Sequence, residues 1–337
     1  MSEGGKRVDS LSIEGWSPEF GSPVETDRDE VPAAQVDAGA ELPPAEWRPL
    51  GAAGAMKPAR VYFVDGVRRI EARVWMSHGG EPSLGICASY GAGVVRCGRR
   101  AEIVAARVRR AFFGRAGVPD LVTRAGTFTA CPVADDDIRQ LVNGLQERMG
   151  QLEIEVAETA LPSASRSSRD GALMVVDGPL RGRQRIAGAT GYVKSHRVQY
   201  LSGEPRATVA RLAPGQRTPV FLIQTTWTRY SWYLRLTRAE GHPWAGIVRC
   251  EAWHDTGLGE VKRLADATAA VLPRFASEPH KDDRAPQNLY PIGGLERELR
   301  RRLGDTGMVY RALRRAAGDY RPRHGSPTGP GTAAVPP

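Results

Sequence analysis

Cysteine, lysine and long hydrophobic runs are all scarce in this chain of 337 residues. The four cysteines include no Cys-x-x-Cys pair, which argues against a zinc ribbon and a disulfide scaffold and favours a reducing compartment. No apolar run approaches the roughly 18 residues of a membrane-spanning helix, and no N-terminal stretch is both basic and apolar. We therefore expect a soluble, cytoplasmic protein with no signal peptide and no membrane contact.

Two common catalytic signatures are also missing. The chain has no glycine-rich loop that ends in Gly-Lys-Ser or Gly-Lys-Thr, which excludes a P-loop ATPase. It has no Gly-x-Ser-x-Gly elbow, which argues against an α/β hydrolase.

The basic residues are almost all arginine. Five lysines leave 42 arginines among the 47 Lys and Arg residues, and the formal net charge is +9. A GC-rich genome would also explain the bias toward arginine. The charge itself favours an acidic partner, most simply nucleic acid, because the forked guanidinium group binds phosphate oxygens well.

Composition divides the chain into three parts. Residues 1–56 are acidic and rich in Gly, Pro and Ala without a sustained period, so we expect a disordered arm. Residues 57–320 are patterned like a folded domain, and residues 321–337 again predict a disordered tail. The arm contains three isolated aromatic residues, Trp16, Phe20 and Trp47. They are either incidental or part of a docking motif that becomes ordered on a partner.

Periodicity within the folded part alternates between strand and helix. Strands are predicted near residues 60–65, 69–77, 84–97, 101–113, 172–177, 189–201, 219–225, 230–237 and 244–253. Helices are predicted near residues 135–161, 258–276 and 291–317. Early strands, a long helix, a further strand and terminal helices together favour an α/β fold in which helices flank a mixed sheet.

Two short apolar runs, residues 61–66 and 173–178, each end in Asp-Gly. Such runs are typical of buried strands, and an ionised carboxylate at the end of one is costly unless something pairs with it. Asp65 and Asp177 are therefore candidates to meet at one end of a sheet and to hold a divalent metal ion. Asp-Gly is also a common hairpin turn, and the first pair fits a turn between two predicted strands.

A third carboxylate and a lysine add to these candidates. On the long predicted helix, Glu153 lies at the edge of the apolar stripe and faces the sheet, where it would complete an oxygen site for Mg²⁺ or Mn²⁺. It could equally be a boundary residue that reaches water. Lys194 follows the second Asp-Gly in a strand-like run, where it either contacts a phosphate or a leaving oxygen or is simply solvated.

Two later segments have the composition of nucleic-acid-binding surfaces. Residues 227–236 interleave aromatic side chains with arginine, which suits base stacking but also a strand with one aromatic face in the core. Residues 296–302 combine Glu and Arg on a helix that begins near Pro291. We interpret this charged run, which includes Glu296, as a solvated or DNA-facing surface.

In their order and spacing these motifs resemble the NurA family of nucleases. The resemblance covers residues 58–320 and includes Val-Asp-Gly at 64–66, a helical Glu, Val-Asp-Gly-x-Leu at 176–180, Gly-x-x-Lys at 191–194, Tyr-Leu-Arg-Leu at 233–236 and Tyr-Pro at 290–291. It implies an RNase H-like core and a Mn²⁺- or Mg²⁺-dependent deoxyribonuclease, acting as a 5′–3′ exonuclease, a single-strand endonuclease or both. Such a nuclease would work as a homodimer with a hexameric HerA-type ATPase in DNA end resection.

Carried over by position, the resemblance makes Asp65 and Asp177 the metal-binding aspartates, Glu153 the helical ligand and Tyr290 the late aromatic residue near the site. Lys194 and Tyr290 would assist catalysis. The sequence departs from the family pattern at four positions, Val67, Pro179, Arg297 and Glu298. The first two replace serines that usually follow Asp-Gly, and the last two stand where a histidine is expected. Glu298 could serve as a metal ligand in place of that histidine.

The leading hypothesis is thus a metal-dependent DNA nuclease. One alternative keeps the fold and DNA binding without catalysis, as an adaptor subunit of the ATPase. Another, a carboxylate-pair hydrolase such as a glycosidase, fits the two aspartates but not the basic charge, and it would be indifferent to EDTA.

Overall fold

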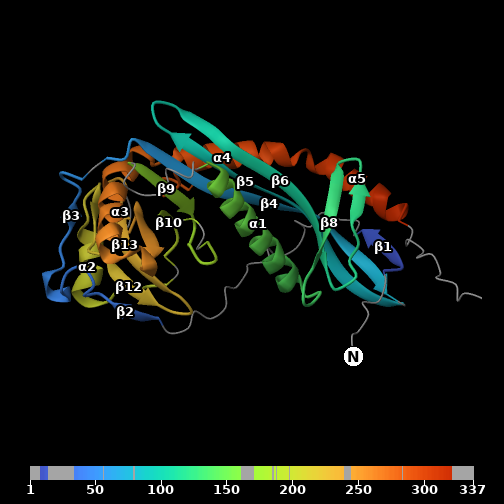
Figure 1. Cartoon of the computed structure of the whole chain (residues 1–337), viewed down its shortest axis with the longest axis horizontal. Coiled ribbons are helices and arrows are strands. Elements are labelled where there is room, and N and C mark those ends of the chain that lie inside the picture. The colour runs from blue at the N-terminus through green and yellow to red at the C-terminus, as the bar shows by residue number, and fades with distance from the viewer. Residues whose placement is uncertain are drawn as a thin grey trace, which may run out of the picture.

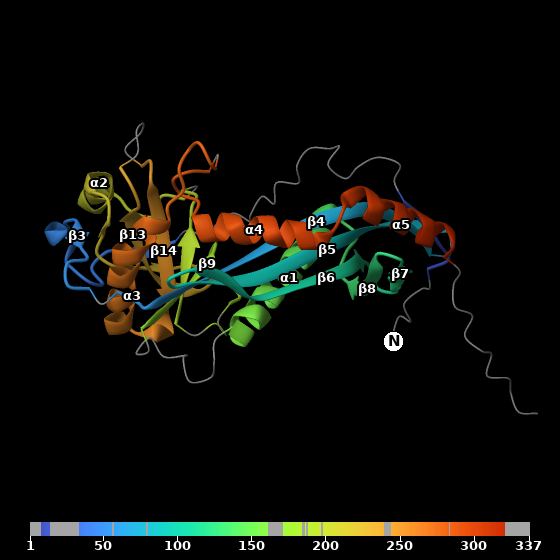
Figure 2. The same ribbon diagram turned by 90° about the horizontal axis from the view of Figure 1, so that it is seen from above.

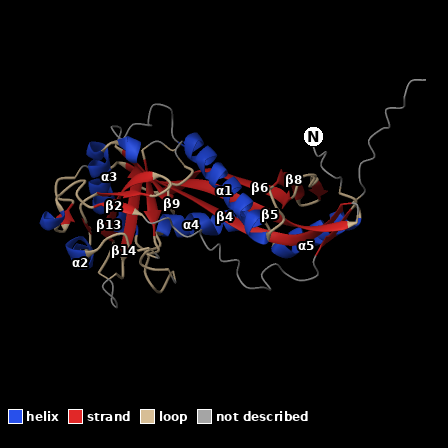
Figure 3. Ribbon diagram, turned by 90° about the horizontal axis from the view of Figure 1, so that it is seen from below, coloured by secondary structure: helices blue, strands red, loops and turns tan. Residues whose placement is uncertain are grey.

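The computed structural model describes residues 8–13, 34–55, 57–78, 80–160, 171–183, 186, 188–196, 198–238, 244–282 and 284–320. Their fourteen strands join in one mixed sheet, and helices pack on both of its faces (Figures 1 and 3). The α/β class predicted from the sequence, a mixed sheet flanked by helices, is confirmed. No helix in the described part of the chain is long and apolar enough to cross a membrane.

Two long antiparallel pairings form the centre of the sheet. β4 (Arg60–His78) pairs along its length with β5 (Glu81–Cys97), and β5 pairs with β6 (Ala101–Gly114). β4 runs straight through Asp65, because β5 supplies a partner there in Gly93. Asp65 is therefore at neither a strand end nor a hairpin turn, and both sequence interpretations of the first Asp-Gly are wrong.

Helix α1 (Ile138–Ala160) leads from these strands to a parallel set. Its apolar stripe, predicted from the sequence, is buried against one face of the central strands. β9 (Ala172–Asp177) runs parallel to β4, and β10 (Ala189–Val193) runs parallel to β9. The central strand order is thus β6-β5-β4-β9-β10.

Beyond β10 the sheet is antiparallel again. The order continues through β14 (Ile247–Trp253), β13 (Thr228–Arg235) and β12 (Phe221–Gln224). One face of these strands is covered by α3 (Leu258–Val271) and the 3₁₀ turn η5 (Leu272–Phe275), which follow the 3₁₀ turn η4 (His254–Thr256). The opposite face is covered by α2 (Gly203–Arg211), a helix that the sequence did not predict.

Part of the N-terminal arm is folded against this end of the sheet. β2 (Gln35–Asp37) pairs with β12, and, after the 3₁₀ turn η1 (Pro44–Glu46), β3 (Leu50–Gly51) pairs with β11 (Gln216–Arg217). The expectation of a disordered arm is wrong for residues 34–55.

A buried cation explains why this segment is held. Arg217 is 3% exposed and pairs with Glu41 at 2.8 Å and with Asp266 at 2.7 Å. A buried guanidinium needs carboxylate partners, and the arm supplies one of the two that Arg217 has. Trp47 is also buried, with its ring centroid 6.2 Å from that of Phe221 on β12. Two other aromatic residues of the arm, Trp16 and Phe20, and the predicted tail at 321–337 lie outside the described residues.

The other end of the molecule is built on the far halves of the long strands. β8 (Gly126–Pro132) pairs with β6, β7 (Leu121–Thr123) pairs with β8, and β1 (Ser10–Ile13) pairs with β4. The sequence did not predict these three strands, and since β1 belongs to the N-terminal arm, the expectation of disorder is wrong for residues 8–13 as well. Helix α5 (Thr306–Gly318) packs against this end.

Helix α4 (Tyr290–Leu303) lies along β4 and β5 on the face opposite α1 (Figure 2). The sequence predicted one helix over residues 291–317, but the structure has two, because α4 ends before Gly304 and α5 begins after Asp305. Gly304 has a φ of 88°, and Asp305 caps α5 by accepting a hydrogen bond from the Met308 amide at 2.7 Å. A glycine with positive φ followed by an aspartate N-cap is the usual signal for one helix ending and another beginning.

Candidate metal centre

Asp65 and Asp177 lie side by side because each follows directly after the last paired residues of the parallel strands β4 and β9. The last register pair between β4 and β9 is Val64 with Val176, so the next residue on each strand is an aspartate. The residues two positions before each aspartate pack toward α4. Side chains alternate along a strand, so both carboxylates are presented on the α4 face of the sheet.

Helix α4 adds a third carboxylate, Glu296. One oxygen each from Asp65, Asp177 and Glu296 lies within 4.8 Å of the other two. Sequence reasoning missed Glu296, because the arginines around it indicate a solvated surface. Helical spacing is the signal that finds it, since it follows the buried Ile292 by four residues and precedes the buried Leu299 by three. We call these three residues the acidic cluster.

Asp65 is the most buried member of the acidic cluster, at 6% exposed. Its Oδ1 accepts a hydrogen bond from the Gly66 amide at 2.8 Å, whereas its Oδ2 is buried without a hydrogen-bond partner in the described structure. Burial raises the pKa of Asp65 well above its usual value, and the charges of Asp177, Glu153 and Glu296 raise it further. A bound cation would relieve this excess of negative charge.

Two cations already pair with the other members of the cluster. Lys194 Nζ donates hydrogen bonds to Asp177 Oδ2 at 2.7 Å and to Asn288 Oδ1 at 3.0 Å. Arg284 donates two hydrogen bonds to Glu296, at 2.9 and 2.7 Å. Burial alone would raise the pKa of Glu296, but pairing with Arg284, helped by Lys194, lowers it. Within the described residues, neither cation donates a hydrogen bond to Asp65.

Glu153, the predicted helical ligand, borders the acidic cluster but is held by an arginine. It is 2% exposed, and Arg183 donates to its Oε2 from Nε at 2.7 Å and also from Nη2. Burial raises the pKa of Glu153, Arg183 opposes that rise, and Asp177 adds to it. A Cβ on Gly66 would lie only 2.7 Å from Glu153 Oε1. This close approach of α1, rather than a turn, explains the glycine after Asp65.

Two other candidates on α4 have partners of their own. Tyr290 is 38% exposed, and its ring centroid lies 5.3 Å from Lys281 Nζ. Glu298 pairs with Arg301 and Arg302, which lower its pKa to about 2. The carboxylate that α4 brings to the acidic cluster is therefore Glu296, two residues before the position suggested by the sequence.

The acidic cluster fits a divalent cation that prefers oxygen ligands. Carboxylate oxygens suit Mg²⁺ and Mn²⁺ alike, so the ligand set does not discriminate between them. The unpartnered Oδ2 of Asp65 is free to act as a ligand, and the surrounding negative charge favours a cation. Such an ion can polarise a phosphoryl or carbonyl oxygen and activate water. Neither protein-family models nor curated proteins yield a match to this chain.

Proposed function

We propose that the protein is a metal-dependent nuclease that hydrolyses phosphodiester bonds of DNA, with Mn²⁺ or Mg²⁺ held by Asp65, Asp177 and Glu296. The observation that carries this proposal is the convergence of three carboxylates around a buried, unpartnered oxygen. The net charge of +9 supports a polyanionic substrate, whose binding would weaken steeply with added salt.

Each surrounding residue has a distinct part in this proposal. A bound ion would stabilise the charge that develops on the scissile phosphate and lower the pKa of attacking water. Lys194 holds a positive charge at the edge of the cluster, in reach of a substrate phosphate. Glu153 is not one of the three converging carboxylates and its Oε2 is held by Arg183, so we assign it a positioning role through its contact with Gly66. Tyr290 would contact the substrate beside the cluster.

An RNase H-like core and membership of the NurA family are part of the same proposal. Support comes from the three antiparallel strands β4, β5 and β6, and from α1 leading into the parallel β9, with the two aspartates on adjacent strands β4 and β9. The cytoplasmic location, the homodimer, the HerA-type ATPase partner and the role in end resection are proposed on the sequence resemblance.

A non-catalytic DNA-binding subunit is the second candidate. It is favoured by Lys194 and Arg284, which already pair with two of the three carboxylates. Val67 and Pro179, which replace the serines of the family pattern, point the same way. This candidate predicts DNA binding that is sensitive to salt but no cleavage with any divalent ion.

End-labelled single- and double-stranded DNA incubated with Mn²⁺ or Mg²⁺ tests the proposal. Cleavage is expected to disappear in EDTA and in Asp177→Asn, and to persist in Asp255→Asn, a control at a fully exposed aspartate. Binding without cleavage, even with an added hexameric ATPase, would leave the adaptor. A hydrolytic activity that survives EDTA would instead favour a carboxylate-pair hydrolase.

A further inference from the structure

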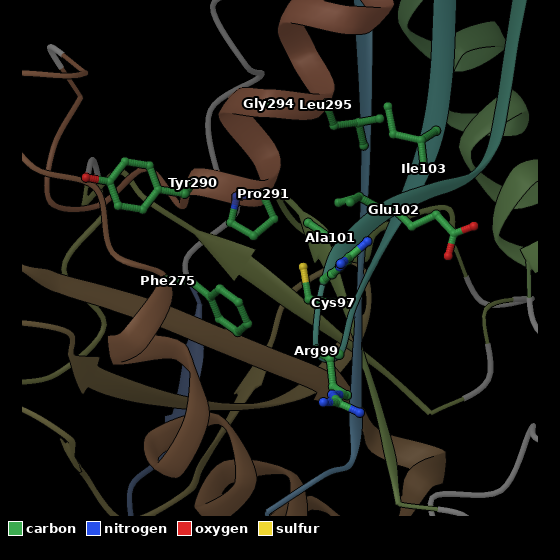
Figure 4. Close-up of a pocket in the computed structure, with 13 residues that line it drawn as sticks. Cys97, Arg99, Ala101, Glu102, Ile103, Phe275, Tyr290, Pro291, Gly294 and Leu295 are labelled. Carbon is green, nitrogen blue, oxygen red and sulfur yellow. The ribbon is translucent and has the colours of Figure 1, made fainter.

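A groove of about 420 Å³ lies between the β5–β6 turn, η5 and the start of α4 (Figure 4). Its walls are mainly apolar or aromatic, and they include Cys97, Ile103, Phe275, Tyr290, Pro291 and Leu295. On α4 it is bordered by Gly294, where a Cβ would meet nothing within 4 Å. Leu295, the next residue, is buried over Gly93 and separates the groove from Glu296 on the other side of the helix. The groove is therefore an open apolar site apart from the acidic cluster.

The groove adjoins an unpaired edge of the sheet. β6 pairs with β5 over residues 101–113, but β8 pairs with its other side only at residues 111–114. In the part of the chain that the structure describes, no strand covers the outer side of residues 101–110, and Figure 2 shows β6 as the outermost of the three long strands. A register shift leaves Val104 without a partner on β5, so residues 105–110 are the regular part of this edge. Their outward amides and carbonyls can pair with an added strand.

Positive charge predominates along this edge. Arginine side chains recur at the end of β5, on the turn that follows it and on β6: Arg96, Arg99, Arg100, Arg107 and Arg109. Two acids, Glu102 and Glu155, pair with three of these arginines. Arg99 and Arg100 at the tip of the turn are exposed, and neither side chain has an ion-pair or hydrogen-bond partner within the described residues. A ligand of this edge is therefore expected to be acidic.

The same charges oppose pairing of this edge with a second copy of the chain. Antiparallel pairing of two β6 strands would bring the turn arginines of one copy close to Arg107 and Arg109 of the other, and like charges across strands are destabilising. Nucleic acid would satisfy the arginines, but its backbone has no row of amides and carbonyls to complete the edge. An acidic polypeptide in extended conformation satisfies both the edge and its charge.

We propose that this surface binds an extended acidic segment of another protein, which adds a strand to β6 and places an apolar side chain in the groove. Main-chain hydrogen bonds along residues 105–110 would supply affinity, and the groove would select the apolar residue. Carboxylates on the exposed face of the segment would pair with Arg99 and Arg100. The inference stands independently of the proposed nuclease function, because it uses neither the acidic cluster nor a bound metal ion.

A synthetic peptide tests this inference on the full-length protein. The probe is a fluorescein-labelled peptide of about twelve residues in which valine and glutamate alternate, and its binding is measured by anisotropy in EDTA. The matched probe carries lysine in place of glutamate. We expect the acidic peptide to bind at least about tenfold more tightly. Equal binding of the two peptides would contradict an acidic partner.

Filling the groove separates docking there from general attraction to a basic protein. Gly294→Leu places a side chain in the groove and should weaken binding of the acidic peptide roughly tenfold. Gly259→Leu on α3 is the matched control, because a Cβ at that helical glycine also meets nothing within 4 Å. Equal peptide binding by the two variants and the wild type would remove the groove from the site.

The two turn arginines are tested in the same assay. Arg99→Ala with Arg100→Ala should weaken binding of the acidic peptide about threefold, because each exposed ion pair contributes little. The control Arg124→Ala with Arg139→Ala removes the same charge from two other exposed arginines and should leave binding unchanged. Equal losses in the two double variants would mean that only the net charge of the protein attracts the peptide.

Strand addition is tested by methylating amides of the peptide. Along a strand, alternate residues direct their amides to the same edge, so methylation of the valine amides or of the glutamate amides blocks opposite edges. We expect one of these two peptides to lose binding at least about tenfold and the other to retain it. Equal binding by both would rule out strand addition to β6.

Other occupants of the groove would give different results. A single-stranded oligonucleotide that loses affinity in Gly294→Leu while the acidic peptide does not would assign the groove to nucleic acid and overturn the inference. A dimer in sedimentation that Gly294→Leu dissociates would assign the groove to a second copy, with the same consequence. Because these measurements use neither cleavage nor a divalent ion, failure of this inference leaves the nuclease proposal standing, and failure of the nuclease proposal leaves this inference standing.

Discussion

Two charged clusters lie near the end of β9, on opposite faces of the sheet, and they differ in how their charges are paired. Asp177 is in register with Tyr192, which packs on the α4 face. Glu251 is in register with Gly191, the neighbour of Tyr192, and therefore lies on the other face.

Two arginines pair with the single carboxylate of Glu251. Glu251 is fully buried, and its Oε2 pairs with Arg249 at 2.6 Å and with Arg229 at 3.3 Å. Its Oε1 accepts a hydrogen bond from the Leu180 amide at 2.8 Å, so Glu251 also holds the turn that follows Asp177. Tyr200 lies beside both guanidinium groups, with its ring centroid 5.2 and 5.6 Å away from them.

The comparison teaches that burial of charge does not by itself indicate function. Glu251 has a partner for each oxygen, as expected of a structural ion pair. The acidic cluster leaves an oxygen of Asp65 unpartnered beside two other carboxylates. An arrangement that is unfavourable without a ligand is one that proteins maintain for binding or catalysis.

The largest expected effect is on stability, and it concerns the ion pairs around Glu251. Glu251→Gln should lower the free energy of unfolding by about 3–5 kcal/mol, because it leaves Arg249 buried without its counter-ion. Urea denaturation followed by circular dichroism measures this loss. The control Glu204→Gln breaks an exposed pair with Arg211 and should change stability by less than about 0.5 kcal/mol. Equal effects of the two substitutions would show that the network around Glu251 is not structural.

A substitution in the acidic cluster should have the opposite effect on stability. Asp65→Asn should raise the free energy of unfolding in EDTA, by on the order of 1 kcal/mol, because it removes a buried charge that Asp177 and Glu296 repel. It should also lower metal-dependent cleavage at least about a hundredfold and abolish any rise in melting temperature with Mn²⁺. Loss of stability in EDTA would contradict the view that this cluster is held for a ligand.

The sequence alone predicts those features of the fold and the site that depend on local patterns. The apolar stripe of α1 and the strand that ends at Asp177 follow from periodicity within one segment. The approach of Asp65 to Asp177 was also predictable, because two apolar strands that each lead into an aspartate can pair in parallel and align their ends. In β4 the strand continues past Asp65, since β5 pairs with it there and no local pattern reports that partner.

The parts that were missed depend on contacts between distant segments. Glu296 joins the cluster only because α4 docks across β4 and β5, and its own neighbours are arginines. The fold of residues 34–55 depends on Glu41 meeting Arg217, 176 positions away in sequence. Composition alone suggested a solvated helix and a disordered arm, because it carries no information on such pairings.

Gly66 lies between Asp65 and the Glu153–Arg183 pair, so its substitution sharpens the comparison. Gly66→Ala should lower the free energy of unfolding by about 1–3 kcal/mol, because the new Cβ would lie 2.7 Å from Glu153 Oε1 and 3.0 Å from a carbon of Met149. Urea denaturation tests this effect. Gly51→Ala is the control, since a Cβ in that strand meets nothing within 4 Å. A Gly66→Ala protein as stable as Gly51→Ala would mean that α1 does not approach β4 this closely.

The smallest expected effect concerns Glu41, a second acid balanced by an arginine. Burial alone would raise the pKa of Glu41, but the hydrogen bonds and charge of Arg217 outweigh it and lower the pKa below 4.5. A lowered pKa contributes stability above 4.5 that is lost as the pH falls through the folded-state value. Glu41→Gln should therefore lower the free energy of unfolding by on the order of 1 kcal/mol at neutral pH, and by progressively less below about pH 4.5. Urea denaturation at neutral pH and at a pH below about 4.5 would show the difference. A difference that is constant with pH would mean that Glu41 holds the arm by packing and not by its charge.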